Sequence, residues 1–170
     1  AGVRFAKLTL TTRRFPGLVA TGVAVLALSA CSSSSLPTLT GFAAVRDQAA
    51  RTESAASDRA TQLAEVATDC ASCSAALRAV AAASDERLEA LGGLWDPWGG
   101  TPPEGASAPA AVSEAPTDVS AFVAWLARTA TRDLEIAADT NRTSADEART
   151  LSAAALGRYA SAVTIAQAYG

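Results

Sequence analysis

The sequence predicts an all-α protein, a four-helix bundle of two antiparallel hairpins joined by one long Gly/Pro-rich crossover. Three observations predict this class. Apolar residues recur every three or four positions in residues 41–91 and again in 117–170, which is the period of a helix with one buried face. Neither Gly nor Pro occurs in residues 42–91, and the irregular segment 92–117 separates the two halves.

The first half is predicted to hold two helices that break near "TDCASCS", because one unbroken helix of about 50 residues would reach about 75 Å and need a partner along its length. Thr68 or Asp69 would cap the second helix, and Gly92 would end it in the left-handed conformation. Arg59 interrupts the apolar stripe. The stripe comprises Phe42, Val45, Ala49, Thr52, Ala56, Leu63, Val66, Cys70, Cys73, Leu77 and Val80.

The second half is predicted to begin a third helix at Thr117 or Asp118, with a tight connection at "TNRT". Ser144 and Glu147 have the spacing of a capping box that starts the fourth helix. The third helix would bury Val119, Phe122, Val123, Leu126, Ala130, Leu134 and Ala137. The fourth would bury Leu151, Ala155, Leu156, Tyr159, Val163, Ala166 and Tyr169.

Residues 1–30 have the order of an export signal, a basic start followed by the apolar run "FPGLVATGVAVLALSA", which is shorter than the roughly 20 apolar residues of a spanning helix. Its end, Leu28-Ser29-Ala30-Cys31, resembles the lipobox of bacterial lipoproteins. The resemblance implies cleavage before Cys31, a diacylglycerol on its thiol, and attachment to the outer face of the cell membrane. Residues 31–40 would then be a Ser-rich tether and 41–170 the helical domain. An ordinary signal peptide or an uncleaved anchor is the alternative.

Charge excludes several classes of partner. All 17 acidic residues and ten of the 14 basic residues lie in residues 31–170, which gives that part a formal charge of −7. An acidic surface without a basic cluster argues against nucleic acid and against electrostatic docking on anionic lipid, so membrane attachment would rest on the acyl chains at Cys31.

The chain contains no His, which removes the commonest general base and the commonest metal ligand. Ser and Thr therefore have no visible base to activate them. The acidic residues stand mostly within a helical turn of an Arg, so we interpret them as a solvated, salt-bridged face and expect no metal site, no cofactor and no catalysis. The six considered are Asp85, Glu86, Glu89, Asp133, Glu135 and Asp139.

Cys70 and Cys73 form the sharpest local motif, "CASC". In an exported chain they are an even pair, and their spacing on a helical turn lies within disulfide reach. We expect a structural disulfide that pins the turn between the first two helices. Two reduced core cysteines and a thiol-redox pair are the alternatives; a zinc site would need about four ligands.

Trp95 and Trp98 stand in "LGGLWDPWGG", where Asp96-Pro97-Trp98-Gly99 fits a type I turn. The two rings are predicted to plug the open end of an Ala-rich bundle. Alternatively, one or both form a platform for a ligand or a protein partner.

The lipobox, "CASC", "RLEALGGLWDPWGG" and the last helix "LSAAALGRYASAVTIAQAYG" together resemble a group of lipoproteins of unknown function from high-GC Gram-positive bacteria. Some of these carry a ferritin-like helical domain, which the long crossover would suit. The expected function is a lipid-anchored, non-catalytic bundle that binds a partner or supports the cell envelope. The alternatives are a ferritin-like metal or oxidoreductase protein, a thiol-redox protein using Cys70 and Cys73, and a fragment of a longer chain.

Overall fold

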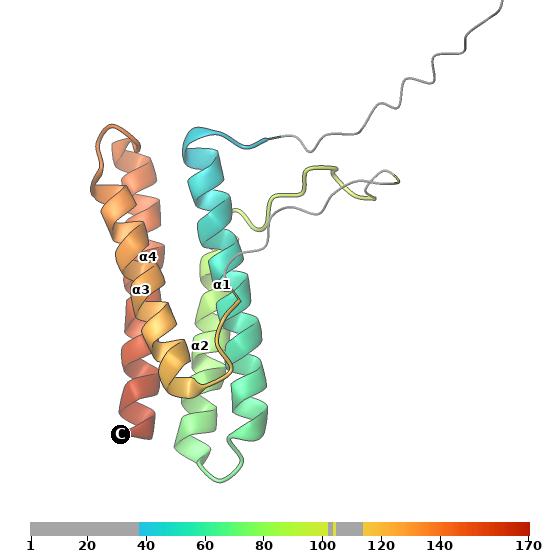
Figure 1. Cartoon of the computed structure of the whole chain (residues 1–170), viewed down its shortest axis with the longest axis vertical. Coiled ribbons are helices and arrows are strands. Elements are labelled where there is room, and N and C mark those ends of the chain that lie inside the picture. Colours follow the sequence, from blue (N-terminus) through green and yellow to red (C-terminus); the bar gives the residue numbers. More distant parts are fainter. Residues whose placement is uncertain (1–37, 102–103, 105–113) are drawn as a thin grey trace, which may run out of the picture. The chain divides into compact units, whose positions relative to one another are not determined.

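The computed structural model describes residues 38–101, 104 and 114–170, and within them it contains four α-helices and no strand. They are α1 (Gly41–Val66), α2 (Ala71–Ala90), α3 (Val119–Ala138) and α4 (Ala145–Tyr169). Helices α1 and α2 form one hairpin and α3 and α4 another, and the two hairpins meet mainly through α2 and α4 (Figure 1). The predicted fold class is confirmed. All described residues belong to one compact unit, Ser33–Gly170.

The direction of the helices explains the long crossover. One apolar cluster gathers Ala49 from the first half of α1, Leu91 at the end of α2, Ala137 at the end of α3 and Leu151 near the start of α4. Helices α1 and α4 therefore begin at the same end of the bundle, and α2 and α3 both finish there (Figure 1). The chain must return along the bundle between α2 and α3. One long crossover between helix pairs also occurs in ferritin-like bundles, a likeness of connectivity alone.

Arg59 fixes the returning crossover to the middle of α1. Its Nε donates to the carbonyl oxygen of Ala115 at 2.8 Å, and its Nη1 donates to Gln62 at 2.7 Å. Ala115 is buried in the second apolar cluster. Arg59 interrupts the apolar stripe of α1 because its side chain binds the backbone of the crossover at Ala115.

The ends of the first hairpin follow the predicted break, with one correction. Helix α1 ends at Val66, and Cys70, rather than Thr68 or Asp69, caps α2, because its Sγ accepts the N–H of Cys73. At the other end, the N–H of Gly93 donates to Leu88 O and that of Gly92 to Glu89 O. With positive φ at Gly92, this is the Schellman arrangement expected of a glycine helix stop.

The ends of the second hairpin were predicted correctly. Asp118 is the N-cap of α3, and its carboxylate accepts the N–H of Ala121 at 2.9 Å. Ser144 and Glu147 form the capping box of α4, in which each side chain accepts the other residue's backbone N–H.

The core consists of Ala-rich contacts and a few large side chains. The larger cluster includes Leu63, Leu77, Phe122 and Trp125, with the last two rings stacked at a centroid distance of 6.0 Å. Trp125 is 5% exposed, and its Nε1 has no hydrogen-bond partner among the described residues. The sequence pattern had not assigned Trp125 to the core.

The predicted inner face of α4 is mostly wrong. Leu151 and Ala155 are buried as expected, but the remaining five predicted core residues are exposed. The buried face continues instead through Arg158, because its ion pairs with Glu53 and Asp133 turn that side of the helix inward. The exposed residues are Leu156, Tyr159, Val163, Ala166 and Tyr169.

Candidate functional site

Four charged side chains, one from each helix, meet inside the bundle. They are Glu53 of α1, Arg87 of α2, Asp133 of α3 and Arg158 of α4, and we call this set the ion network. The side chains of Glu53 and Arg158 are fully buried, that of Asp133 is 2% exposed, and that of Arg87 is 14% exposed. Charged residues are almost never buried to this degree unless they are paired.

Arg158 lies at the centre of the ion network. Its Nε and Nη2 donate to the same oxygen, Oε1 of Glu53, at 3.0 and 2.8 Å, and its Nη1 donates to Oδ2 of Asp133 at 2.8 Å. One guanidinium group therefore ties α4 to both α1 and α3. The planar fork of arginine allows this, whereas a lysine ammonium would act as a single point charge.

Arg87 reaches the same carboxylate from α2. Its Nε donates to Oε2 of Glu53 at 3.0 Å, and its Nη2 donates to Ser84 at 2.9 Å and to Ser161 at 3.3 Å. A Cβ at Gly157 would stand 2.9 Å from Cδ of Arg87, closer than ordinary contact allows. Because Gly157 has no side chain, the Arg87 side chain has room to pass close to the α4 backbone at this point.

Asp133 completes the set of pairs. Its second oxygen, Oδ1, accepts from Nε and Nη2 of Arg132 at 3.0 and 2.8 Å. All four carboxylate oxygens of Glu53 and Asp133 accept hydrogen bonds from guanidinium groups. Two negative charges therefore face three positive ones.

Because every one of these four carboxylate oxygens accepts at least one hydrogen bond from an arginine, the interior carboxylates hold the fold together instead of standing free for a ligand. Burying an ion pair costs about as much free energy in lost hydration as the attraction between the two charges returns. Replacing one partner by a neutral residue, however, leaves an uncompensated buried charge and is strongly destabilising. The network thus penalises any shift of one helix against the other three. Its carboxylates are neutralised by arginine, where carboxylate bundles of the di-iron type use theirs to bind metal. No group of three or more potential metal ligands gathers within the described parts of the chain.

Most of the ion network does not follow from the sequence pattern. The prediction that Asp133 belongs to a solvated face is wrong, because Arg158 and Arg132 hold its carboxylate inside. Asp139 is partly buried, and the other acids of that set are exposed as expected: Asp85, Glu86, Glu89 and Glu135. The expected salt bridges of these acids do not form among the described residues, because the nearby Arg87 and Arg132 pair with Glu53 and Asp133.

Glu53, Arg87 and Arg158 were not predicted, although a signal for Arg158 existed. Leu151, Ala155, Arg158, Ala162 and Ile165 recur at alternating steps of four and three, so Arg158 shares the face of two residues that were assigned correctly.

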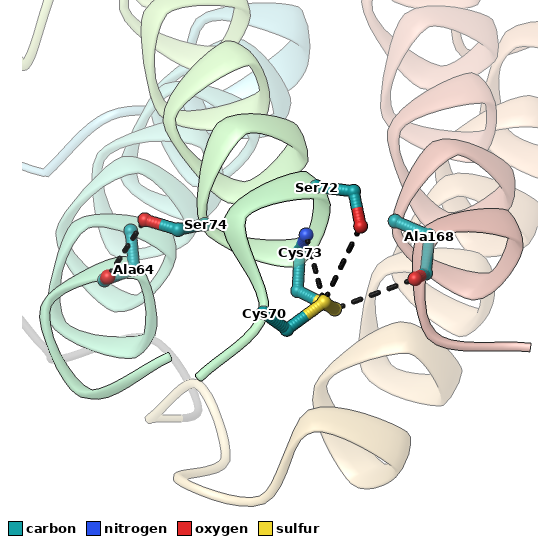
Figure 2. Close-up of a disulfide and its surroundings, with 6 residues drawn as sticks. All are labelled: Ala64, Cys70, Ser72, Cys73, Ser74 and Ala168. Carbon is teal, nitrogen blue, oxygen red and sulfur yellow. Dashed lines mark hydrogen bonds between the residues drawn. A yellow bond between two sulfur atoms is a disulfide. The ribbon is translucent and has the colours of Figure 1, made fainter. Parts of the chain in front are cut away.

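The Cys70–Cys73 disulfide is present, with the two Cα atoms 5.2 Å apart (Figure 2). Cys73 is 3% exposed and Cys70 is partly exposed. The Sγ of Cys73 lies 3.3 Å from the carbonyl oxygen of Ala168 near the end of α4, and Ser74 donates to Ala64 O across the turn (Figure 2). The bond therefore stands where the α1–α2 turn meets the last turn of α4.

Trp95 and Trp98 lie in the chain that leaves α2. Asp47 and Arg51, themselves paired at 2.8 Å, bind the N–H and the carbonyl group of Trp95. Asp96 accepts the N–H of Trp98, so a turn forms there. Both tryptophans are partly buried, and neither belongs to the two apolar clusters or to the residues packed on them. Leu91 and Leu151 are the large side chains buried in the apolar cluster at this end of the bundle.

A groove of about 470 Å³ runs along α1 beside the two ends of the crossover. Its two arginines already have partners: Arg51 pairs with Asp47, and Arg59 binds Ala115 and contacts Glu114. The groove offers no unpaired arginine to an anionic ligand.

Cys31 and the lipobox-like residues lie outside the described residues. Among those described, no helix has both the length and the apolar character needed to cross a membrane. Comparisons with protein families, with curated proteins and with solved structures found no match for this chain.

Proposed function

We propose that this protein is a lipid-anchored helical bundle on the extracytoplasmic face of the cell membrane, with a binding or envelope-structural role rather than an enzymatic one. The order of basic, apolar and small residues before Cys31 supports the anchor. Two acyl chains on one diacylglycerol provide stable attachment where a single chain is marginal.

The ion network is the observation that favours a non-catalytic role. A bundle that binds a metal or a substrate in its core needs polar groups free to receive it. Here the interior carboxylates are occupied by Arg87, Arg132 and Arg158. We therefore assign the function to the surface of the bundle. A surface site favours a binding role over catalysis and over the ferritin-like metal alternative.

Fractionation of cells that produce the whole chain tests the anchor. We expect the native protein in the membrane fraction, with the mass of a diacylglycerol on an N-terminal Cys31. A Cys31→Ser variant should lose this mass and leave the membrane fraction. The double variant Cys70→Ser/Cys73→Ser is the matched control and should stay attached. Membrane retention of Cys31→Ser without acylation would overturn the proposed anchor.

Metal binding tests the second half of the proposal. We expect the purified domain to bind neither Fe²⁺ nor Mn²⁺ in equilibrium dialysis. Stoichiometric binding that is lost in a Glu53→Gln variant with an unchanged helical content would overturn the non-catalytic interpretation and favour the metal alternative.

A thiol-redox role is a second candidate, favoured by the position of Cys70. It caps the N-terminus of α2 and is more exposed than Cys73, so its sulfur is the one that an external thiolate can reach. In such a role, two thiols of a substrate would become a disulfide while the Cys70–Cys73 bond became two thiols. The reduction potential of the Cys70–Cys73 disulfide, measured against glutathione, distinguishes a redox role from a structural one. A value below about −300 mV is typical of structural disulfides, and a higher one of exchanging disulfides.

A further inference from the structure

The outward face of α4 carries an apolar row that the fold does not use. Leu156, Tyr159 and Val163 are 58%, 51% and 41% exposed. They follow Ser152 and precede Ala166 at alternating steps of four and three residues. We call these five residues the α4 seam. Single exposed apolar residues are normal on a protein surface, but three large ones that follow one another on one helix face are typical of an interaction site.

The α4 seam is also free of charge. Arg158 is the only charged residue in 151–170, and it is buried on the other side of the helix. The rest of the domain is acidic, since residues 31–170 have a formal charge of −7. The seam is therefore a surface on which another acidic molecule can be placed without bringing like charges into direct contact.

The spacing identifies the kind of partner. Apolar residues at alternating steps of three and four form the seam of a coiled coil, in which side chains of one helix enter the spaces of another. Ala153 and Ala160, next to the seam and exposed, leave such spaces open. A helix bound to a membrane surface typically carries Lys or Arg on its polar face, and α4 has none exposed beyond Arg149. The seam thus fits a helix better than a lipid surface.

We propose that the partner is a second copy of this chain, with the two α4 seams packed against each other about a two-fold axis. A second copy supplies a seam with the same spacing, the same small neighbours and no charge among its five residues from Ser152 to Ala166. A symmetric contact uses the same patch on both subunits, which one seam provides. This inference deepens the proposed binding role and rests on it.

Only one orientation of the dimer is compatible with the proposed anchor. Helices α1 and α4 begin at the same end of the bundle (Figure 1). The expected tether, residues 31–40, directly precedes α1 in the sequence. Parallel packing of the two α4 helices places both tethers at one end, where one membrane can hold them. Antiparallel packing would separate them by roughly the length of α4, about 37 Å for its 25 residues. We therefore expect the parallel arrangement.

Sedimentation equilibrium of the compact unit 33–170, in which both apolar clusters and the ion network lie, tests the proposal. We expect a dimer that dissociates on dilution, because one helix from each copy makes a small interface. Tyr159→Glu should raise the dissociation constant at least ~10-fold, equivalent to about 1.4 kcal/mol. Val66→Glu is the matched control, since Val66 is 75% exposed on α1, and it should dimerise like the native unit.

Cysteine cross-linking tests the orientation in a Cys70→Ser/Cys73→Ser background. In a parallel dimer each seam residue meets its own counterpart, so Leu156→Cys and Val163→Cys should both give disulfide-linked dimers, and Val66→Cys should not. A native unit that stays monomeric at millimolar concentration, or an unchanged dissociation constant for Tyr159→Glu with native helical content, would overturn the proposal. So would a monomer that binds uncharged lipid vesicles through Tyr159. None of these results depends on Cys31, so the lipid anchor stands or falls separately.

Discussion

Arg158 and Glu53 are joined by two hydrogen bonds to one oxygen, at 3.0 and 2.8 Å, with both side chains fully buried. The two residues stand 105 positions apart in the chain and belong to different hairpins. This pair, with Arg87 and Asp133 on either side, holds the two hairpins in one register. It is also the reason that the apolar row of α4 faces outward.

The two buried carboxylates should differ in their importance for stability. Glu53→Gln leaves Arg158 and Arg87 short of a buried counter-charge, so we expect a loss of about 3–5 kcal/mol in the free energy of unfolding. Asp133→Asn should cost less, about 1–3 kcal/mol, because half of its pairing is with Arg132, whose side chain is 43% exposed. Urea denaturation measures both. Glu65→Gln, at an exposed site of α1, is the control and should change stability by under about 0.5 kcal/mol. Equal losses at Glu53 and Asp133 would contradict the difference.

The effect of Gly157→Ala on stability should change sign according to which residue stands at position 87. Alanine is about 1 kcal/mol better than glycine inside a helix, but here its Cβ would press on Arg87 at 2.9 Å. We expect Gly157→Ala to destabilise the native protein and to stabilise an Arg87→Ala variant. Thermal unfolding of the four combinations gives the coupling. Stabilisation in both backgrounds would show that Arg87 does not cross α4 at Gly157.

Alanine substitution should destabilise the protein more at the core tryptophan, Trp125, than at the two loop tryptophans, Trp95 and Trp98. Trp125 is 5% exposed in the larger apolar cluster, so Trp125→Ala should cost about 3–5 kcal/mol. Trp95 and Trp98 lie outside both clusters, and each alanine variant there should cost under about 2 kcal/mol. A loss at Trp95 or Trp98 as large as that at Trp125 would support the prediction that these rings plug the bundle. A near-zero loss would favour their alternative role as a platform for a partner.

Asp118 should contribute to stability in a pH-dependent way. The N–H of Ala121, followed by the hydroxyl of Ser120, holds the pKa of Asp118 below its usual value of 3.8, because both bonds favour the charged form. A carboxylate with a lowered pKa in the folded state stabilises the fold above its unfolded pKa, and this contribution is lost as the pH falls through the folded value. Asn also caps helices but does not titrate. The advantage of Asp118 over an Asp118→Asn variant should therefore be constant near neutral pH and disappear in acid. Melting temperatures across this range measure it, and a difference independent of pH would contradict it.

Signals between residues that are close in the sequence predict most of the fold. Gly92, Asp118 and the Ser144–Glu147 capping box act within one helical turn, so their signals are complete in the neighbouring residues. The Cys70–Cys73 pair is equally local. These features decided where the helices begin and end, and the Gly- and Pro-rich crossover decided how they are connected.

The rotation of α4 could not be predicted in the same way. Two rows of residues shifted by one position, one through Leu156 and Tyr159 and the other through Arg158 and Ile165, both have helical spacing. Hydropathy favours burying the first row. The second row is buried because Glu53 and Asp133, on two other helices, supply the charges that Arg158 needs. Only the assembled bundle brings these residues together.

Hydrogen exchange at the arginine side chains shows directly whether the ion network inside the bundle is closed to water. The Nε–H of Arg158 donates to Glu53 in a fully buried site, whereas the side chain of Arg149 is 76% exposed. In nitrogen-15 NMR spectra of the native protein, we expect the Arg158 Nε–H to persist and to exchange only through opening of the fold. The Arg149 Nε–H should exchange rapidly with solvent. Exchange at Arg158 as fast as at Arg149 would show that the interior is open to water and would contradict the account.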